Sequence, residues 1–239
     1  MSIEKTKSSF ILGLFLLLGL SSLGYLLSAS VNEFKKYDRT VSVKGLSERE
    51  IPANIALWPI QFTNTNNDLS SLYSKMENDT KKILEFLMQN GFKESEITIS
   101  PPSITDKLAQ QYGNNKTIEY RYLASRTITV YTDKIDLVRS TANKIIDLGK
   151  KGIVFTGNKF QGNTEFLFTK LNDVKPEMIE EATRKAREVA EKFAKDSNSK
   201  LGKIKTARQG QFSINARDKN TPHIKKIRIV STVVYYLSD

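Results

Sequence analysis

An uncharged apolar stretch over residues 10–29 constrains this chain more than any other feature of its sequence. It reads FILGLFLLLGLSSLGYLLSA and follows one glutamate and two lysines. About 20 apolar residues make a helix roughly 30 Å long, which matches the hydrocarbon core of a bilayer. The stretch therefore predicts a membrane-spanning helix, whose apolar body includes Phe10, Leu14, Leu18, Leu23 and Leu27.

A cleaved secretory signal is the alternative interpretation of residues 1–30. Such signals have an apolar core of about 7–15 residues, followed by small residues at the cleavage site. Small residues follow at 28–30, but Leu26 and Leu27 crowd the site and an A-x-A pattern is missing. Both interpretations predict a protein of the cell envelope. Its domain is either anchored to the inner membrane and faces the periplasm, or is periplasmic after cleavage.

The chain contains no cysteine and carries a strong positive charge. The lack of cysteine excludes disulfides, thiolate nucleophiles and cysteine metal sites. The formal net charge of +11 favours anionic partners, although a solvated basic surface has the same composition. Export argues against nucleic acid as that partner. The candidate contacts for an anionic surface lie near the C-terminus: Lys203, Lys205, Arg208, Arg217, Lys219, Lys225, Lys226 and Arg228.

Strand and helix patterns alternate regularly after a polar linker at residues 31–39. Period-two alternation and turn residues predict strands at 40–44, 51–63, 96–100, 118–131, 153–155, 165–169, 203–212 and 224–237. Apolar residues spaced three and four apart predict helices that begin after Asp68 or Ser70, after Asp133, and near Lys175. The order β-β-α occurs three times and is followed by two more strands.

This order predicts an α+β fold over residues 40–239, in which repeated β-β-α units pack their helices on antiparallel or mixed sheets. The length suits one large domain or two small ones packed together. We expect Gly45 to end the first strand and Pro176 to lie in the first turn of the last helix. The alanines at 182, 186, 190 and 194 give that helix a narrow flank, which can lie close against a sheet.

Several short motifs, taken in order, resemble the SIMPL-domain family. They are VSVKG at 41–45, IPANIA at 51–56, LMQNGF at 87–92, YRYLA at 120–124, TITV at 127–130, EATRKAREVAEKFA at 181–194 and LGKI at 201–204. The family includes bacterial periplasmic immunogenic proteins and a periplasmic protein linked to defence against oxidative stress. This chain departs from the family pattern at Ala53-Asn54, where an Asp often follows the proline, and at Gly45-Leu46-Ser47, where Gly-x-Gly is common.

The resemblance implies an exported and often oligomeric protein without an assigned catalytic residue. Some members of the family assemble into ring- or channel-like oligomers. A eukaryotic relative is described as a partner of a signalling adaptor. Binding is therefore the activity that the resemblance favours, and we expect a homo-oligomer.

The residues themselves indicate no catalytic or cofactor site. The only histidine, His223, lies in a polar loop before a strand, with no second histidine or cysteine to join it. Residues 157–162 (GNKFQG) resemble a phosphate loop but precede a predicted strand instead of a helix, which favours a turn. Tyr120, Arg121 and Tyr122 interleave aromatic and basic groups, as a half-exposed strand also does. We expect no enzyme activity, no cofactor and no metal site.

Two functions follow as hypotheses. The first is a non-enzymatic, exported or membrane-anchored envelope protein that self-associates and supports the envelope or its tolerance of oxidative stress. The second is a binding module for an anionic ligand, such as a lipid headgroup, a glycan or another polyanion, through the basic C-terminal strands. The sequence identifies no small-molecule ligand.

Overall fold

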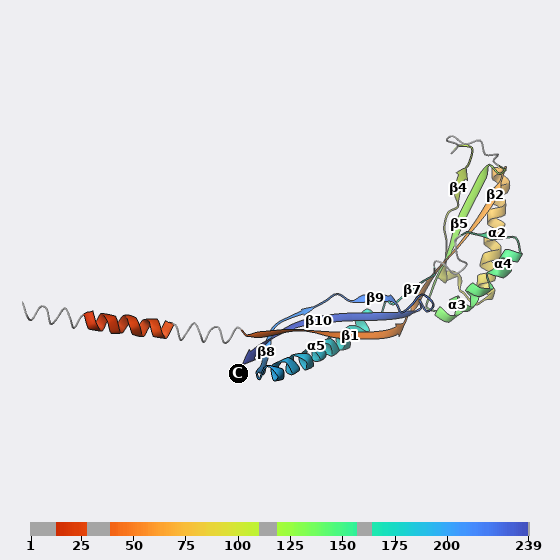
Figure 1. The fold of residues 1–239 in the computed structure, drawn as a ribbon. Coiled ribbons are helices and arrows are strands. Elements are labelled where there is room, and N and C mark those ends of the chain that lie inside the picture. The colour runs from red at the N-terminus through yellow and green to blue at the C-terminus, as the bar shows by residue number, and fades with distance from the viewer. Residues whose placement is uncertain (1–12, 28–38, 110–118, 157–163, 239) are drawn as a thin grey trace, which may run out of the picture. The chain divides into compact units, whose positions relative to one another are not determined.

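The computed structural model describes residues 13–27, 39–109, 119–156 and 164–238 (Figure 1). The strands are β1 (Thr40–Pro52), β2 (Ile55–Asn66), β3 (Ile97–Ile99), β4 (Ser103–Asp106), β5 (Tyr122–Thr132), β6 (Val154–Phe155), β7 (Glu165–Leu167), β8 (Lys200–Gln209), β9 (Ser213–Ala216) and β10 (Ile224–Ser238). The helices are α2 (Leu69–Gln89), α3 (Ile135–Lys144), α4 (Ile146–Lys150) and α5 (Leu171–Asp196), with a 3-10 turn η1 at Glu94–Glu96. The predicted α+β fold with helices on antiparallel sheets is confirmed.

The N-terminal apolar stretch is helical over residues 13–27, and its described side chains are exposed. Leu14, Leu18, Leu23 and Leu27 belong to this helix, whereas Phe10 lies outside the described residues. Within the described ranges, no helix is both long enough and apolar enough to cross a membrane. These residues therefore do not confirm the membrane-spanning helix predicted over 10–29. The predicted linker, apart from Arg39, and the predicted turn at 157–162 also lie outside the described residues.

Residues 39–238 belong to two compact units that share several elements. Unit 1 combines the chain up to Glu48 with Val174–Ser213 and Arg228–Asp239, and unit 2 combines Arg49–Asp173 with Ile214–Ile227. The boundary thus falls within β1, near the start of α5, within β9 and within β10. Neither unit is formed by one continuous piece of chain.

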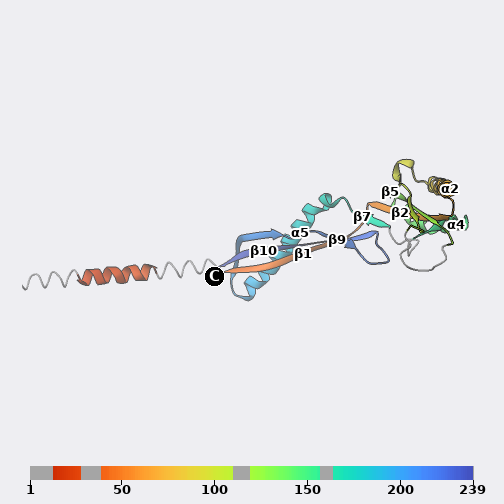
Figure 2. The same ribbon diagram turned by 90° about the horizontal axis from the view of Figure 1, so that it is seen from above.

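Unit 1 is a sheet in the order β1-β10-β8, with α5 along one face (Figures 1 and 2). The core between them holds Val43 of β1, Val233 and Tyr235 of β10, and Ala186 and Ala190 of α5. All four alanines of the predicted flank are buried. Small side chains let the helix backbone approach the strands closely, so the predicted role of the alanine flank is confirmed.

Gly45 does not end the first strand, because β1 continues to Pro52. It lies under α5, where a Cβ atom would stand 1.8 Å from the carbonyl oxygen of Ala182 and 2.6 Å from the amide nitrogen of Ala186. The glycine is thus required by the approach of a helix backbone, and not by a turn. Next to it, the buried Ser47 hydroxyl donates to Glu181 Oε2 at 2.8 Å and ties the same strand to the same helix.

The last helix also begins earlier than predicted. Helix α5 starts at Leu171, so Pro176 lies inside it and not in its first turn. A proline in the helix interior lacks the N–H that would bond to the carbonyl four residues earlier. The buried stripe of α5 starts only at Met178, so the apolar periodicity gave no sign of the helical segment before it.

Unit 2 is built on the long strands β2 and β5, which pair antiparallel from Ala56↔Thr132 to Asn66↔Tyr122 although α2, β3 and β4 lie between them in the chain. Strands β3 and β4 pair with β5, and β6 and β7 pair with β2. Helix α2 packs on the β2–β5 pair (Figure 1). The core joins Leu72, Met76, Ile83 and Leu87 of the helix to Trp58, Ile60, Phe62, Ile128 and Val130 of the strands.

Local signals set the ends of α2 as predicted. The Asp68 side chain accepts a hydrogen bond from the Ser71 N–H at 2.8 Å, and Gly91 follows the C-cap Asn90 with a φ of 95°. The start of α3 differs from the prediction, since Asp133 makes no cap and the Thr132 hydroxyl accepts from the Lys134 N–H at 3.2 Å.

Candidate functional site

The eight predicted basic residues are divided between the two units. Lys203, Lys205 and Arg208 lie on β8 and Arg228 on β10, all within unit 1. The other four, in unit 2, lie in or beside the β9–β10 loop: Arg217, Lys219, Lys225 and Lys226. The chain segment that suggested one basic surface therefore supplies two separate groups of residues.

Two arginines of the unit 1 group lie on the sheet face that α5 leaves uncovered, and Lys203 is an exposed residue of β8. On β10, the buried Ser231 and Val233 face α5, so Thr232 between them faces the other way. Arg208 of β8 pairs with Thr232 and therefore lies on the same face as Thr232. Arg228 alternates with the buried Ile227 and Ile229 in the same way. Both arginines therefore point away from the helix.

An aromatic side chain on the same face contacts a third cation, Lys205. Tyr236 alternates with the buried Tyr235 and so shares the uncovered face, and the Lys205 Nζ lies 5.3 Å from the centre of its ring. On β1, Lys44 and Leu46 alternate with Val43, Gly45 and Ser47 and are exposed. We call Lys44, Leu46, Lys205, Arg208, Arg228 and Tyr236 the open face. Glu48 is the acidic residue that follows Lys44 and Leu46 in this alternation.

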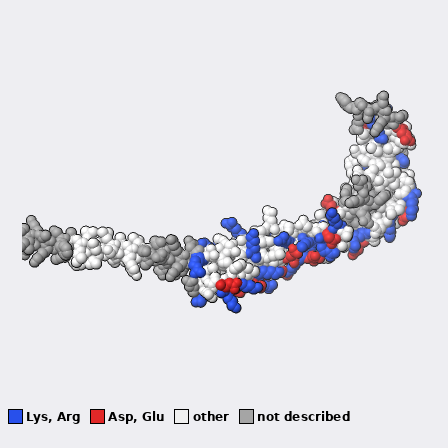
Figure 3. Space-filling model, viewed as in Figure 1, with Lys and Arg blue, Asp and Glu red and all other residues white. Residues whose placement is uncertain are grey.

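The two faces of unit 1 differ in charge. Along α5, basic and acidic side chains alternate and form i,i+4 ion pairs, such as Lys185–Glu181 at 2.6 Å and Arg187–Glu191 at 3.0 Å. Strand β8 carries no acidic residue. Figure 3 shows mixed red and blue atoms along α5, and blue atoms where β8 and β10 lie.

In the unit 2 group, Arg217 helps to hold a loop in place. Arg217 Nε lies 3.0 Å from Asp218 Oδ2, and Arg217 Nη1 lies 3.4 Å from Glu50 Oε2. The hydrogen bond to Asp218 is the main cause that raises the pKa of Arg217. Burial lowers the pKa of Lys225. Of the four, Arg217 and Lys219 are exposed, whereas Lys225 and Lys226 are half-buried.

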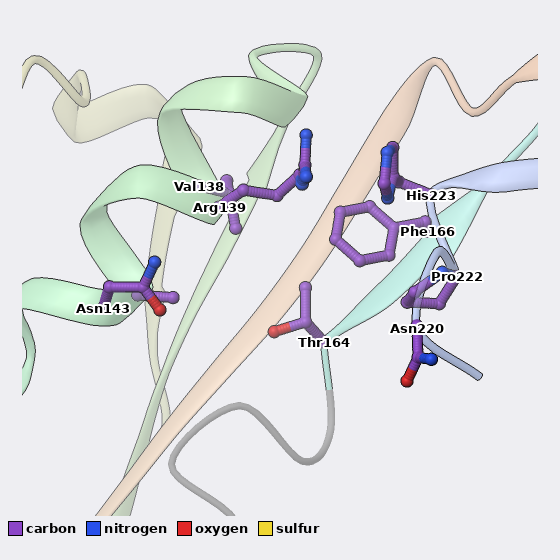
Figure 4. A pocket seen from close by; sticks show the side chains of 9 residues that line it. Val138, Arg139, Asn143, Thr164, Phe166, Asn220, Pro222 and His223 are labelled. Atoms are coloured by element: carbon purple, nitrogen blue, oxygen red, sulfur yellow. The ribbon is translucent and has the colours of Figure 1, made fainter.

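A pocket of about 230 Å³ lies in unit 2 between α3, β7 and the β9–β10 loop (Figure 4). Helix α3 supplies Val138 and Arg139, β7 supplies Phe166, and the loop supplies Asn220, Pro222 and His223. Figure 4 shows the Arg139 side chain directed toward the His223 side of the pocket, near the ring of Phe166. No acidic residue is among the described residues that line it. No motif in the sequence predicted a pocket at these residues.

Hydrogen bonds fix the loop that carries three of the pocket residues. Asp218 accepts from the N–H groups of Asn220 and Thr221, each at 2.8 Å, and also from the Thr221 hydroxyl. These bonds and Arg217 hold the pKa of Asp218 far below its usual range. The Ala53 N–H donates to the His223 carbonyl at 2.7 Å. The loop that carries Asn220, Pro222 and His223 is therefore preorganised.

His223 lies in a loop as predicted, but it is half-buried. Its ring meets that of Phe166 edge-on, with 5.9 Å between the ring centres. Burial lowers the pKa of His223 below its ordinary value of 6.5, and the positive charges of Arg139 and Arg217 lower it further. Asp136 and Asp218 act in the opposite direction. The imidazole is therefore neutral at pH 7 and has one N–H donor and one acceptor nitrogen.

The low pKa predicts a specific loss of stability in mild acid. The pKa of His223 is lower in the folded chain than in the unfolded chain. At a pH between these two values, His223 binds a proton in the unfolded chain but not in the folded chain. The free energy of unfolding therefore falls as the pH falls through about 6.5. We expect the urea midpoint of the natural chain to drop more between about pH 7.5 and pH 5 than that of a His223→Gln variant. Trp58 fluorescence would report the transition, since this residue lies in the core of unit 2. Parallel pH profiles for the two proteins would contradict the prediction.

Within the described part of the chain, no group of three or more His, Cys, Asp or Glu side chains could hold a metal ion.

Comparison with known proteins identifies the family. No curated protein matches the chain. The model of the SIMPL family, whose description is "Protein of unknown function (DUF541)", matches residues 41–231 and so extends over parts of both units. The resemblance inferred from the sequence motifs is thereby confirmed. The chain belongs to the SIMPL family.

Proposed function

We propose that this protein is a non-enzymatic, membrane-tethered component of the cell envelope, and that its SIMPL domain binds anionic lipid headgroups through the open face. The observation that carries the proposal is the asymmetry of unit 1. One side of its sheet is covered by α5, and the other presents Arg208 and Arg228 together with Lys205, which lies against the ring of Tyr236.

The composition of the open face suits a membrane surface. Lys and Arg side chains near an anionic leaflet contribute about 1 kcal/mol each. Tyrosine is enriched at membrane interfaces, because its ring is apolar and its hydroxyl is polar. Leu46 and Tyr236 are each 38% exposed and add apolar area between the cations.

The N-terminal stretch gives the second membrane signal of the proposal. Residues 10–29 contain no charged side chain, and the ends of this stretch lie outside the described residues. A basic patch alone binds membranes weakly and reversibly, whereas two signals on one chain reinforce each other. A tethered domain needs only a modest affinity for headgroups, because the tether raises its local concentration at the surface.

The absence of cysteine allows a direct test in the full chain. A Thr206→Cys variant carries one thiol on the open face, because Thr206 pairs with Val234, which alternates with the buried Val233 and Tyr235. We expect an environment-sensitive dye at this site to shift to the blue in nanodiscs of phosphatidylglycerol and phosphatidylcholine, but not in pure phosphatidylcholine. Raising the salt from about 50 mM to about 500 mM should reverse the shift.

The matched control places the dye on α5, through Val189→Cys, where no lipid-dependent shift is expected. Replacing Lys205, Arg208 and Arg228 by Gln should weaken the contact about 100-fold, at about 1 kcal/mol for each charge. Replacing the exposed Lys75, Lys81 and Lys93 by Gln removes the same charge from unit 2 and should have little effect. Equal emission in both kinds of nanodisc would contradict the proposal, as would a soluble polyanion that evokes the full shift without anionic lipid.

Self-association is a second candidate function, and the edges of the unit 1 sheet favour it. Among the described strands, β8 pairs only with β10, and nearly all its residues are exposed. An exposed strand edge can pair with a strand of another chain, although its lysines counteract such pairing. We expect light scattering on the detergent-solubilised full chain to give a protein mass above that of one chain. A monomer at micromolar concentration would count against this function.

A further inference from the structure

We propose that the unit 2 pocket binds a small organic carboxylate, with Arg139 holding the carboxylate and Phe166 contacting the apolar body of the ligand. This site lies outside the open face and is independent of the proposed membrane contact. The floor of the pocket, its cation and its histidine each support this ligand class.

The floor of the pocket is apolar. Val138, Ala142 and Phe166 are all buried to at least nine-tenths, yet their side chains line the pocket. Pro222 adds another apolar surface from the loop. A ligand in this space would therefore place a hydrocarbon or aromatic group against Phe166, as in most small-molecule sites.

Arg139 supplies the charge that such a ligand would meet. Its Nη1 lies 3.1 Å from Asp136 Oδ1, in an ion pair whose side chains are 49% and 92% exposed. An exposed ion pair of this kind contributes little free energy. The guanidinium has five N–H donors, of which the hydrogen bond to Asp136 uses one. The remaining N–H groups of the guanidinium can bind a carboxylate through two parallel hydrogen bonds.

His223 favours a singly charged ligand. Its imidazole is neutral at pH 7, and neither ring nitrogen bonds to any described residue. It can donate one hydrogen bond without adding a second positive charge. A phosphate dianion would leave much of its charge uncompensated here, whereas a monocarboxylate is balanced by the single arginine.

The remaining polar groups of the pocket are uncharged. The side chains of Thr164 and Asn220 line it and have no hydrogen-bond partner among the described residues. They can bond to polar substituents of a ligand. The charged groups near His223 are Arg139, Asp136, Arg217 and Asp218, and the last two pair with each other at 3.0 Å. Of these four charges, Arg139 acts most strongly on His223, although Asp136 pairs with it. A volume of about 230 Å³ suits a molecule of the size of benzoate.

His223 is the only histidine of the chain, so its NMR signal reports binding at this site in the full chain. Benzoate is titrated into the detergent-solubilised protein, and the Cε1–Hε1 signal of His223 is followed by NMR. We expect a saturable shift with a dissociation constant of about 1 mM or lower. The pKa of His223 should rise on saturation, because a nearby carboxylate stabilises the imidazolium. Benzamide, which has the same shape without the charge, and inorganic phosphate should each bind at least about 10-fold more weakly.

The matched variants test the role of Arg139. Arg139→Gln should weaken benzoate binding at least about 10-fold. Arg187→Gln, which removes an arginine from an equally exposed ion pair on α5, should leave binding unchanged. No saturable shift up to about 20 mM benzoate would overturn the proposal. So would equal binding of benzamide or phosphate, or unchanged binding by an Arg139→Gln protein whose amide spectrum matches that of the natural chain.

Discussion

A Gly45→Ala variant is expected to lose more than about 3 kcal/mol of unfolding free energy. The added Cβ would lie 1.8 Å from the Ala182 carbonyl oxygen, a distance that no pair of non-bonded atoms tolerates. Its neighbours are backbone atoms of α5, which cannot turn aside as the end of a flexible side chain can. The helix must therefore move off β1, and the contact of Val43 with Ala186 and Ala190 is lost with it.

Urea unfolding followed by circular dichroism measures this effect, and hydrogen exchange of the α5 amides assigns it to unit 1. Gly149→Ala is the matched control, because no atom lies within 4 Å of the Cβ position at Gly149 and the residue is helical. Alanine there should be neutral or stabilise by up to about 1 kcal/mol. A Gly45→Ala protein within about 1 kcal/mol of the natural chain would show that α5 does not lie against β1 as described.

A Phe62→Ala variant should cost about 3–5 kcal/mol, through the loss of a large buried side chain and the cavity that remains. Phe62 is fully buried in the core of unit 2, on the strand β2 that both β5 and β6 join. The fluorescence of Trp58, the only tryptophan of the chain, follows unfolding of that same core.

Phe193→Ala is the corresponding control, since Phe193 is 55% exposed on α5. Its removal should change stability by less than about 0.5 kcal/mol. Equal effects of the two substitutions would mean that Phe62 does not occupy the core position described here.

Features that depend on nearby residues could be predicted from the sequence. The cap at Asp68, the stop at Asn90 and Gly91, and the alternation along β2 each involve residues within a few positions of one another. The β-β-α order also emerged correctly, although β4 and β9 were not predicted as separate strands. Such local signals suffice to place most of the elements and to recognise the family.

Features that depend on distant residues could not be predicted. Gly45 resembles a strand-ending glycine until Ala182 is known to lie against it. The pocket joins Arg139, Phe166 and His223 from three separate segments, and on its own helix Arg139 looks like a solvated residue paired with Asp136. The basic C-terminal residues are close in sequence, yet the unit boundary between Ile227 and Arg228 separates their roles.

The order of strands in unit 1 has a consequence for biosynthesis. Its central strand, β10, is the last of the described strands to be made, whereas β1, on one side of it, is the first. Until β10 emerges, β1 and β8 have no partner in this sheet and α5 has only part of the surface on which it packs. Until then these edges remain unpaired, which exposes the growing chain to aggregation. A premature stop before Ile224 would remove the strand that joins the two ends of the fold, so such a fragment is a substrate for proteolysis instead of a smaller folded domain.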